Sequence, residues 1–213
     1  MVRIIWHGHA CFEIVGENVN IVIDPHDGSS IGMPPPKAKG DIILVTHDHF
    51  DHNAVNVVKK PDSIVIDSIV EKEIRGVKIS TVEDYHDPQM GRQRGRVRIY
   101  KLTIEDTTIV HVGDLGRIPD EDKINWMKNV DIFLVPVGGT FTLGGSEAAT
   151  LVKKVTPKVT IPMHYKVPGS RLPISGVDSF LKHFSDIEQV DSNIYEVIKP
   201  LPEGKIVVLK PPR

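Results

Sequence analysis

Residues 42–52 read Ile-Ile-Leu-Val-Thr-His-Asp-His-Phe-Asp-His, an apolar run followed by three histidines and two aspartates within six positions. The run at 42–45 predicts a strand that is covered on both faces. Because the polar cluster begins where this strand ends, we expect it on a loop at a sheet edge, where α/β proteins build their sites. His47 and His49 are two positions apart, so they point to one side of an extended chain. Imidazole and carboxylate donors together favour zinc, manganese or iron over calcium and magnesium.

Further candidate donors follow other β-rich stretches at their carboxyl ends. They are His86 after residues 77–82, Asp114 after residues 107–112, and His164 after residues 158–163. This shared placement predicts that the three side chains reach one rim of the sheets. His111 lies inside the stretch that leads to Asp114, so it is either a core residue or a hydrogen-bond partner of a ligand.

The composition describes an ordinary globular chain. It has 213 residues, of which 40% are hydrophobic and 25% charged, so we expect one domain over residues 1–213. The net charge of −2 argues against nucleic acid as a partner. Cys11 is the only cysteine, which excludes an intramolecular disulfide and a zinc site built from several thiolates. No signal peptide or membrane-length apolar run is visible, which predicts a cytoplasmic protein without a membrane span. The sequence does not fix the oligomeric state.

The remaining pattern predicts an α/β domain in which mixed sheets are layered with helices. Strands are expected at 2–6, 11–15, 18–24, 42–45, 64–66, 77–82, 97–104, 107–112, 132–137, 158–163 and 206–209. Helices are expected at 54–60, 68–75, 119–128, 147–155 and 177–184. We expect the helix at 54–60 to stop at Pro61, and the helix at 68–75 to run from a Ser68 cap to Gly76.

The motif Thr-His-x-His-x-Asp-His at residues 46–52, with the other donors in the same order along the chain, resembles the metallo-β-lactamase superfamily. The resembling residues run from Asp24 to His164, about two-thirds of the chain. Residues 8–12 (Gly-His-Ala-Cys-Phe) and 162–165 (Pro-Met-His-Tyr) also resemble a narrower branch of short metal-dependent hydrolases. L-Ascorbate-6-phosphate lactonases and N-acyl-phosphatidylethanolamine phospholipase D are relatives of that branch. The resemblance implies a four-layer αββα sandwich of two mixed β-sheets flanked by helices, with its metal site at the sheet edges.

The resemblance also implies that the candidate donors hold one or two divalent metal ions. Zinc is the expected metal, and Mn²⁺ or iron are the alternatives. The first ion would be held by His47, His49 and His86. The second would be held by Asp51, His52 and His164, with Asp114 bridging both ions. Asp24 would accept a hydrogen bond from a ligand histidine and so orient it, as metal sites generally require.

Two such cations, about 3.5–4 Å apart, lower the pKa of a shared water from about 15.7 toward about 7 and supply a hydroxide nucleophile. Asp51 would orient that hydroxide or shuttle its proton. The predicted reaction is therefore hydrolysis of an ester, lactone, amide, thioester or phosphodiester in a small-molecule substrate. A nuclease and a redox diiron protein on the same scaffold are the alternatives. The net charge disfavours the nuclease, and diiron relatives tend to carry an acid where this chain has His49.

Three other residues are candidates for contacts with the ligands or the substrate. His9 either lines the site or packs near Trp6. Arg94 is one of four arginines in residues 91–98, a stretch without an acid that follows His86. That stretch is either an exposed turn or a patch for an anionic substrate. Thr140 lies in a glycine-rich segment, residues 137–145, which either lets the backbone approach a ligand closely or is only a tight connection.

Overall fold

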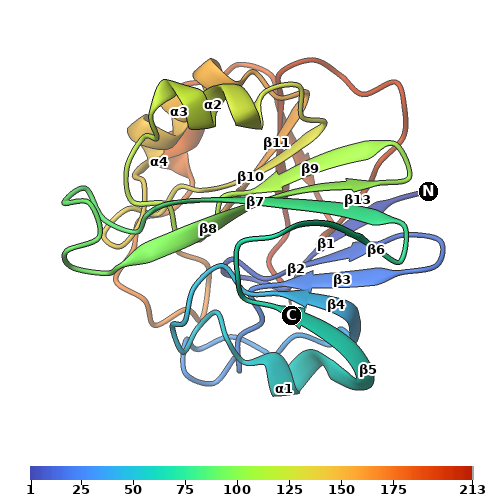
Figure 1. Ribbon diagram of the computed structural model, residues 1–213. Helices are drawn as coiled ribbons and strands as arrows, with labels where there is room; N and C mark the ends of the chain where they lie inside the picture. Colours follow the sequence, from blue (N-terminus) through green and yellow to red (C-terminus); the bar gives the residue numbers. More distant parts are fainter. Residues whose placement is uncertain (213) are drawn as a thin grey trace.

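The protein is described here by a computed structural model of residues 1–212, in which two stacked β-sheets carry helices on their outer faces (Figure 1). The smaller sheet has six strands. In spatial order they are β13 (Ile194–Glu196), β1 (Arg3–Trp6), β2 (Phe12–Val15), β3 (Asn20–Ile23), β4 (Gly40–Leu44) and β5 (Lys59–Ile66). Strands β3, β4 and β5 are parallel and the other neighbours are antiparallel, so this sheet is mixed.

The larger sheet has eight strands and is also mixed. In spatial order they are β12 (Ile187–Val190), β14 (Lys205–Leu209), β11 (Val159–Met163), β10 (Ile132–Pro136), β9 (Thr107–His111), β8 (Arg96–Ile104), β7 (Val77–Tyr85) and β6 (Glu71–Ile74). Neighbours are parallel from β12 to β9 and antiparallel from β9 to β6.

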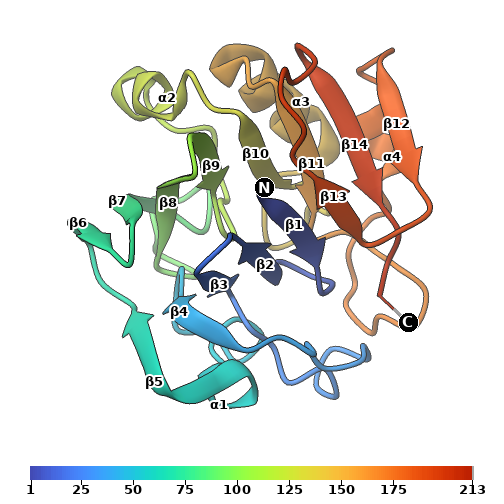
Figure 2. The ribbon, with the colours of Figure 1, turned by 90° about the vertical axis from the view of Figure 1, so that its right-hand side faces the viewer.

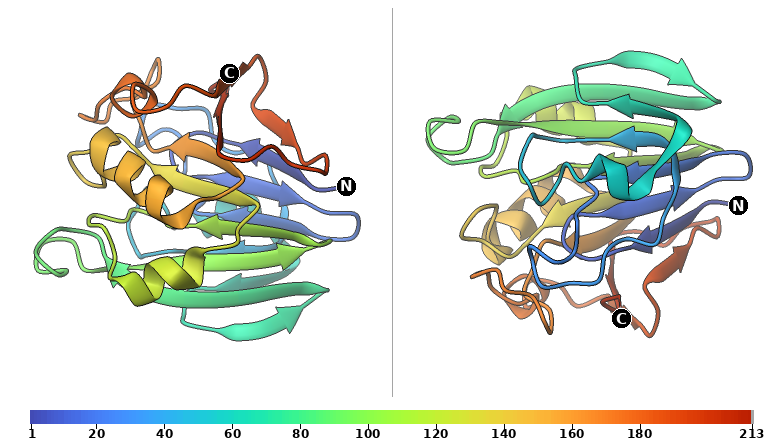
Figure 3. Two further views of the ribbon diagram at one scale, coloured as in Figure 1. Left: turned by 90° about the horizontal axis from the view of Figure 1, so that it is seen from above. Right: turned by 90° about the horizontal axis from the view of Figure 1, so that it is seen from below.

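Four helices complete the layers. α2 (Glu121–Met127), α3 (Gly145–Val155) and α4 (Asp178–Leu181) cover the outer face of the larger sheet, and α1 (Val55–Val58) covers the smaller sheet (Figure 3). Viewed roughly along the strands, the two sheets face each other (Figure 2). The order helix, sheet, sheet, helix confirms the predicted αββα sandwich. None of the helices in residues 1–212 combines the length and apolarity that a bilayer crossing requires.

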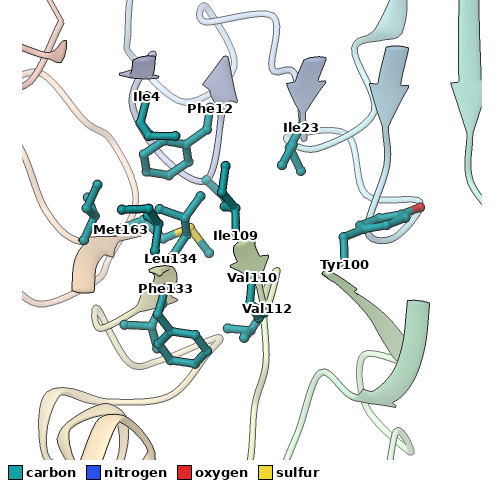
Figure 4. Packing of buried hydrophobic residues seen from close by; sticks show 14 of the residues in the cluster. Ile4, Phe12, Ile23, Tyr100, Ile109, Val110, Val112, Phe133, Leu134 and Met163 are labelled. Atoms are coloured by element: carbon teal, nitrogen blue, oxygen red, sulfur yellow. The ribbon is translucent and has the colours of Figure 1, made fainter. Parts of the chain in front are cut away.

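The main core fills the space between the two sheets. Ile4 and Phe12 of the smaller sheet point toward Leu134 and Met163 of the larger sheet, and all four are fully buried (Figure 4). Phe133, the neighbour of Leu134 on β10, lies on the opposite face, where side chains alternate toward the helices. A second, smaller cluster lies beside α1 and contains Cys11, Val22, Ala38, Ile43 and Val58. β4 is therefore buried on both faces, as its continuous apolar sequence predicts.

The strand directions determine where the polar residues gather. β3, β4, β7, β9 and β11 all run the same way within their sheets, and the candidate donors follow their carboxyl ends. The two sheets are joined at this end by Tyr100 of β8, whose buried hydroxyl lies 3.0 Å from the carbonyl oxygens of both Val45 and Ile66. The stacked sheets therefore hold the loops that follow these strands as one rigid rim.

The prediction of a helix at 68–75 is wrong. Residues Glu71–Ile74 form the edge strand β6, which pairs with β7 in register from Glu71 with Ser80 to Ile74 with Val77. The two turn residues, Arg75 and Gly76, both have positive φ, at 51° and 77°. That conformation is typical of a two-residue hairpin turn, so the glycine that suggested a helix end instead reverses a strand.

The helix predicted at 54–60 is also too long. α1 covers only Val55–Val58, and β5 begins at Lys59 and continues through Pro61. Proline lacks the N–H that a central strand needs, but β5 is the edge of its sheet, where the missing donor faces away from a partner. Two short strands, β12 and β13, were not predicted from the sequence.

Candidate metal centre

The predicted donors come together at the rim formed by the strand ends. They lie on the loop after β4 (His47, His49, Asp51 and His52), after β7 (His86), after β9 (Asp114) and after β11 (His164). His49 and Asp51 are partly exposed and the other five are buried. Residues that are up to 117 positions apart in the sequence therefore share one buried cluster.

His47, His49 and His86 form the first group. One ligand atom from each of the three side chains lies within 4.8 Å of the other two. The ring centroids are 4.5 Å apart for His47 and His49, 4.7 Å for His47 and His86, and 5.0 Å for His49 and His86. Three imidazoles that converge in this way form the donor set of a tri-histidine cation site.

Asp51, His52 and His164 belong to the second group, and His9 joins them. One ligand atom from each of the four side chains lies within 4.8 Å of the other three. His9 Nε2 is 3.1 Å from both Asp51 Oδ2 and His52 Nε2. The sequence left open whether His9 faces the site or packs near Trp6. Its ring faces the site, while its backbone carbonyl accepts a hydrogen bond from the Trp6 indole at 3.0 Å.

Asp114 lies between the two groups. Its Oδ2 atom is 3.1 Å from Nε2 of both His52 and His164, in the second group. The same oxygen is 3.5 Å from His86 Nε2 and 4.0 Å from His47 Nε2, in the first group. Its other oxygen, Oδ1, is buried without a hydrogen-bond partner. This carboxylate can therefore contact cations in both groups.

Asp24 orients two of the histidines through a chain of hydrogen bonds. His52 Nδ1 donates to Asp24 Oδ2 at 3.0 Å, so a bound cation would take the place of the His52 Nε2 proton on the side of Asp114. The Thr46 hydroxyl donates to the same carboxylate oxygen at 2.6 Å and lies 2.9 Å from His47 Nδ1, which donates to it. The Nε2 lone pairs of His47 and His52 thus both face the cluster, an arrangement that cation-binding histidines normally have. Thr46 was part of the sequence motif, but its role in this chain of bonds was not predicted.

The donor set fits bound divalent cations. His47 Nε2 is buried and has no hydrogen-bond partner, although an unpaired buried nitrogen is costly. His52 Nε2 lies 3.1 Å from both His9 Nε2 and Asp114 Oδ2, a distance that suits a hydrogen bond and also suits two ligands of one cation. Two nitrogen ligands about 2.0–2.1 Å from a tetrahedral zinc ion lie about 3.3 Å from one another. The separations in the cluster therefore resemble the edges of a coordination shell.

The electrostatics of the cluster follow from burial and from neighbouring charges. Burial lowers the pKa of His9 and His47 to about 3, and it lowers the pKa of His86 as well. These imidazoles are therefore neutral at physiological pH and have a lone pair available for a cation. Burial also opposes the charged form of His52, but the Asp114 and Asp24 carboxylates outweigh it and raise the His52 pKa. Burial likewise opposes ionised Asp114, whose pKa is nevertheless held low by His164 and His52.

Three residues around the cluster have left-handed backbone conformations. His9, Asp24 and His164 have φ values of 53°, 48° and 51°. Such conformations are unfavourable for residues with a Cβ, and they persist where the surrounding structure enforces them. The His164 amide donates to the His9 carbonyl at 3.1 Å, so two of these residues are bound to each other. The strain is thus concentrated where side chains must be aimed at the cluster.

A pocket of about 280 Å³ opens onto the cluster. It is lined by His49, Phe50, Asp51, His86, Arg94, Asp114, Phe141, His164 and Leu172. Arg94 therefore faces the pocket, in agreement with the functional interpretation of the arginine-rich stretch. Phe50, Phe141 and Leu172 were not identified from the sequence, because an isolated apolar residue in a loop gives no signal of what it faces.

Two candidate residues lie outside the pocket. The Thr140 hydroxyl is exposed and donates to the Pro173 carbonyl at 2.9 Å, so it stabilises a loop contact rather than lining the site. His111 is fully buried between backbone partners: its Nε2 donates to the Ala10 carbonyl at 2.9 Å, and its Nδ1 accepts from the Gly113 amide at 3.1 Å. With both ring nitrogens occupied, His111 is a core residue that holds the segment before Asp114.

Comparison with known proteins agrees with this geometry. A family model described as the β-lactamase superfamily domain matches residues 3–164. A UPF0173 metal-dependent hydrolase from Thermoplasma volcanium is 34% identical over 191 residues, which cover 77% of this chain and 83% of the relative. The corresponding protein from Thermoplasma acidophilum is 31% identical over 187 residues, covering 76% of this chain and 83% of the relative.

Solved structures show the same relationship. The crystal structure of a Thermotoga maritima protein, provisionally assigned as a Zn-dependent hydrolase of the metallo-β-lactamase superfamily, matches with a TM-score of 0.82. The two sequences are 34% identical, and the match covers 98% of each chain. The fold, the family model and the relatives agree, and the chain therefore belongs to the metallo-β-lactamase superfamily and, within it, to the UPF0173 family of metal-dependent hydrolases.

Proposed function

We propose that this protein is a hydrolase that depends on two divalent cations. Zinc is the preferred cation, and manganese and iron are the alternatives. The observation that carries the proposal is the position of Asp114, whose Oδ2 lies within 4.0 Å of Nε2 atoms from both donor groups. The names of the family members support the same general activity.

His47, His49 and His86 would hold the first cation, and Asp51, His52 and His164 the second. Asp114 would contact both through its two oxygens, one of which has no other partner. Asp24 and Thr46 would fix the proton positions on His52 and His47 as described above. The mixture of imidazole and carboxylate ligands suits zinc, manganese and iron, and it does not suit calcium.

When bound by these residues, the cations would supply a water of lowered pKa, about 7, and would polarise the bond that is attacked. The protein supplies the orientation. Asp51 lines the pocket, and although burial opposes its charged form, His9 and His52 lower its pKa well below neutrality. A carboxylate of such low basicity is a poor proton acceptor at pH 7. Asp51 therefore serves to orient the attacking water rather than to retain its proton.

The pocket limits the substrate to a small molecule. Its volume of about 280 Å³ is just below the range for small-molecule sites, which begins at about 300 Å³. The reacting bond would lie beside the members of the two donor groups that line the pocket, which are His49, Asp51, His86, Asp114 and His164. The proposal also includes the cytoplasmic location predicted from the sequence. The only cysteine, Cys11, is buried and forms no disulfide.

The proposal is tested by removing and restoring the cations. Protein treated with a chelator should lose hydrolysis of a panel of esters, lactones and phosphodiesters, and it should regain that activity with Zn²⁺, Mn²⁺ or Fe²⁺. His49→Ala should bind less metal and lose activity, whereas His183→Ala, a change at a distant histidine that contacts Ser146, should retain both. Full activity in the chelated protein or in His49→Ala would refute the proposal. A visible absorption band and turnover that requires O₂ would favour the diiron alternative.

A further inference from the structure

Arg94 places a guanidinium group in the wall of the pocket without an acidic partner. Among the described residues, its side chain forms no hydrogen bond or ion pair, and its one ring contact is with Phe141, whose centroid lies 4.8 Å from the guanidinium carbon. Arg94 is partly buried, and the same pocket is lined by His49, His86 and Asp114. A positive charge that faces a small-molecule pocket and has no internal counter-ion is available to a ligand.

Arg92, on the same loop, is exposed and does not line the pocket, and three other arginines nearby have internal partners. Arg96 forms an ion pair with Glu83 at 3.1 Å. Arg98 donates to the carbonyl oxygens of Val45 and Thr46 at 3.0 and 3.1 Å. Arg117 pairs with Asp120 at 2.6 Å. The free guanidinium is thus a property of Arg94 and not of every arginine near the site.

The loop that carries Arg94 is held in place by Asp87. This buried carboxylate accepts hydrogen bonds from four backbone amides of residues 89–94, at 2.8 to 3.1 Å, and the amide of Arg94 itself is one of them at 2.8 Å. The loop is also attached to the donor cluster, because the His86 amide donates to the Gly95 carbonyl at 3.0 Å. The guanidinium is therefore presented from a braced backbone, which reduces the entropy lost when a ligand binds.

Apolar groups complete the pocket around Arg94. The Phe141 ring stacks on the guanidinium and limits its movement. Phe50, which is 68% exposed, and Leu172 line the same pocket. Three apolar side chains that line one pocket beside polar groups suit the apolar portion of a small ligand.

We propose that the substrate carries an oxyanion, a carboxylate or a phosphate, which binds Arg94 while an adjacent apolar or aromatic portion contacts Phe50, Phe141 and Leu172. This inference rests on the proposed function, because the bond to be cleaved must then lie between Arg94 and the donor cluster. Bound cations would offset the charges of Asp51 and Asp114, and Arg94 is the one arginine or lysine among the described residues that line the pocket, so the oxyanion is placed at Arg94 and the reacting bond at the cluster.

The test compares matched probes on metal-loaded protein. 4-Acetoxybenzoate is the carboxylate probe, 4-acetoxyphenyl phosphate is the phosphate probe, and methyl 4-acetoxybenzoate is the neutral control. Arg94→Ala should reduce kcat/KM for the preferred anion roughly ten- to hundredfold more than for the neutral ester, as expected for the loss of a hydrogen-bonded charge pair. Arg94→Lys should retain an intermediate preference because lysine keeps the charge but not the planar fork. Arg92→Ala, an exposed change on the same loop, should behave like the unmodified protein.

A binding measurement separates this inference from the proposed function. Isothermal titration with 4-hydroxybenzoate and phenyl phosphate measures anion affinity without turnover, so it remains informative if none of the esters is cleaved. Weaker binding of either anion to Arg94→Ala, with unchanged binding to Arg92→Ala, would support the inference, and the tighter-binding probe would identify the preferred oxyanion. Equal affinities in the unmodified and Arg94→Ala proteins, or no binding of either anion to the unmodified protein, would overturn it.

Discussion

His9 Nε2 lies 3.1 Å from Asp51 Oδ2, although the two residues are 42 positions apart and belong to different loops. His9 follows β1 and Asp51 follows β4, two strands of the same sheet whose carboxyl ends reach the same rim. The ring of His9 also lies against that of His164, with a centroid distance of 4.1 Å. His9 is therefore the residue through which the amino-terminal strands take part in the second donor group.

Replacement of His9 should weaken the second cation site selectively. His9→Ala removes the hydrogen bond that orients Asp51, and changes in such supporting contacts typically cost about 10- to 100-fold in metal affinity. We expect one of two Co²⁺ binding steps, followed by visible absorption, to shift by this factor while the other step stays in place. His7→Ala is the matched control, because His7 pairs with Glu13 instead of the cluster. Equal binding curves for His9→Ala and the unmodified protein would show that His9 has no such role.

Replacement of Asp24 should weaken cation binding in both donor groups, because Asp24 contacts His52 directly and His47 through Thr46. Thr46→Val removes only the branch to His47, whereas Asp24→Asn changes both branches. We expect metal affinity to fall about 10- to 100-fold in Thr46→Val and further in Asp24→Asn. The measurement is competition with a chromogenic chelator. If Thr46→Val bound as tightly as the unmodified protein, the chain of hydrogen bonds would not be setting the His47 proton.

The metal-free protein should lose stability on acidification below about pH 6.5, the usual pKa of histidine in an unfolded chain. The pKa values of His9 and His47 are about 3 and that of His26 is about 4 in the folded protein, chiefly because of burial. Between these values and about pH 6.5 the unfolded chain binds protons that the folded chain does not, so the free energy of unfolding falls as the pH falls. His52, whose pKa is raised, is charged in both states over this window and adds no slope of its own.

This pH dependence is checked by urea denaturation of chelated protein at pH 7, 6 and 5. Each histidine that stays neutral in the folded state contributes up to about 1.4 kcal/mol per pH unit. His26→Gln should reduce the slope by one such contribution, because His26 is buried and donates to the His7 carbonyl at 3.0 Å. A free energy of unfolding that is constant from pH 7 to pH 5 would contradict the neutral state of the buried histidines.

The backbone beside His164 should tolerate no side chain at Gly138. A Cβ atom placed there would lie 2.2 Å from the carbonyl oxygen of His164, so the two loops would have to separate. We expect Gly138→Ala to destabilise the protein by about 1–3 kcal/mol, the range for overpacking, and to weaken metal binding. Gly176→Ala is the control, because its nearest contact would be 3.9 Å away. Thermal melts of both variants with and without Zn²⁺ test this expectation, which fails if the two variants melt alike.

The sequence was most informative where local pattern and strand direction act together. The apolar run before His47 predicted a buried strand, and β4 is that strand. The same reasoning placed His86, Asp114 and His164 after strands, and parallel strand directions then bring them to one rim. The predicted hydrogen bond from a ligand histidine to Asp24 is present as the contact with His52.

Features that depend on long-range packing were not predictable. Phe50, Phe141 and Leu172 come from three loops whose approach is decided by the stacked sheets, and no periodicity marks them. The strand at Glu71–Ile74 was mistaken for a helix because Ser68 resembled a helix cap and Gly76 resembled a helix end. Pairing with β7 decides between them, and that contact lies outside the local pattern.

The most direct test of the central claim, that the two donor groups bind two cations bridged by Asp114, is anomalous X-ray diffraction from crystals of the zinc-loaded protein. We expect two anomalous peaks about 3.5–4 Å apart, the usual spacing of paired catalytic cations. One peak should contact His47, His49 and His86, the other Asp51, His52 and His164, with Asp114 between them. A single peak outside these groups, or no peak within reach of Asp114, would contradict the account.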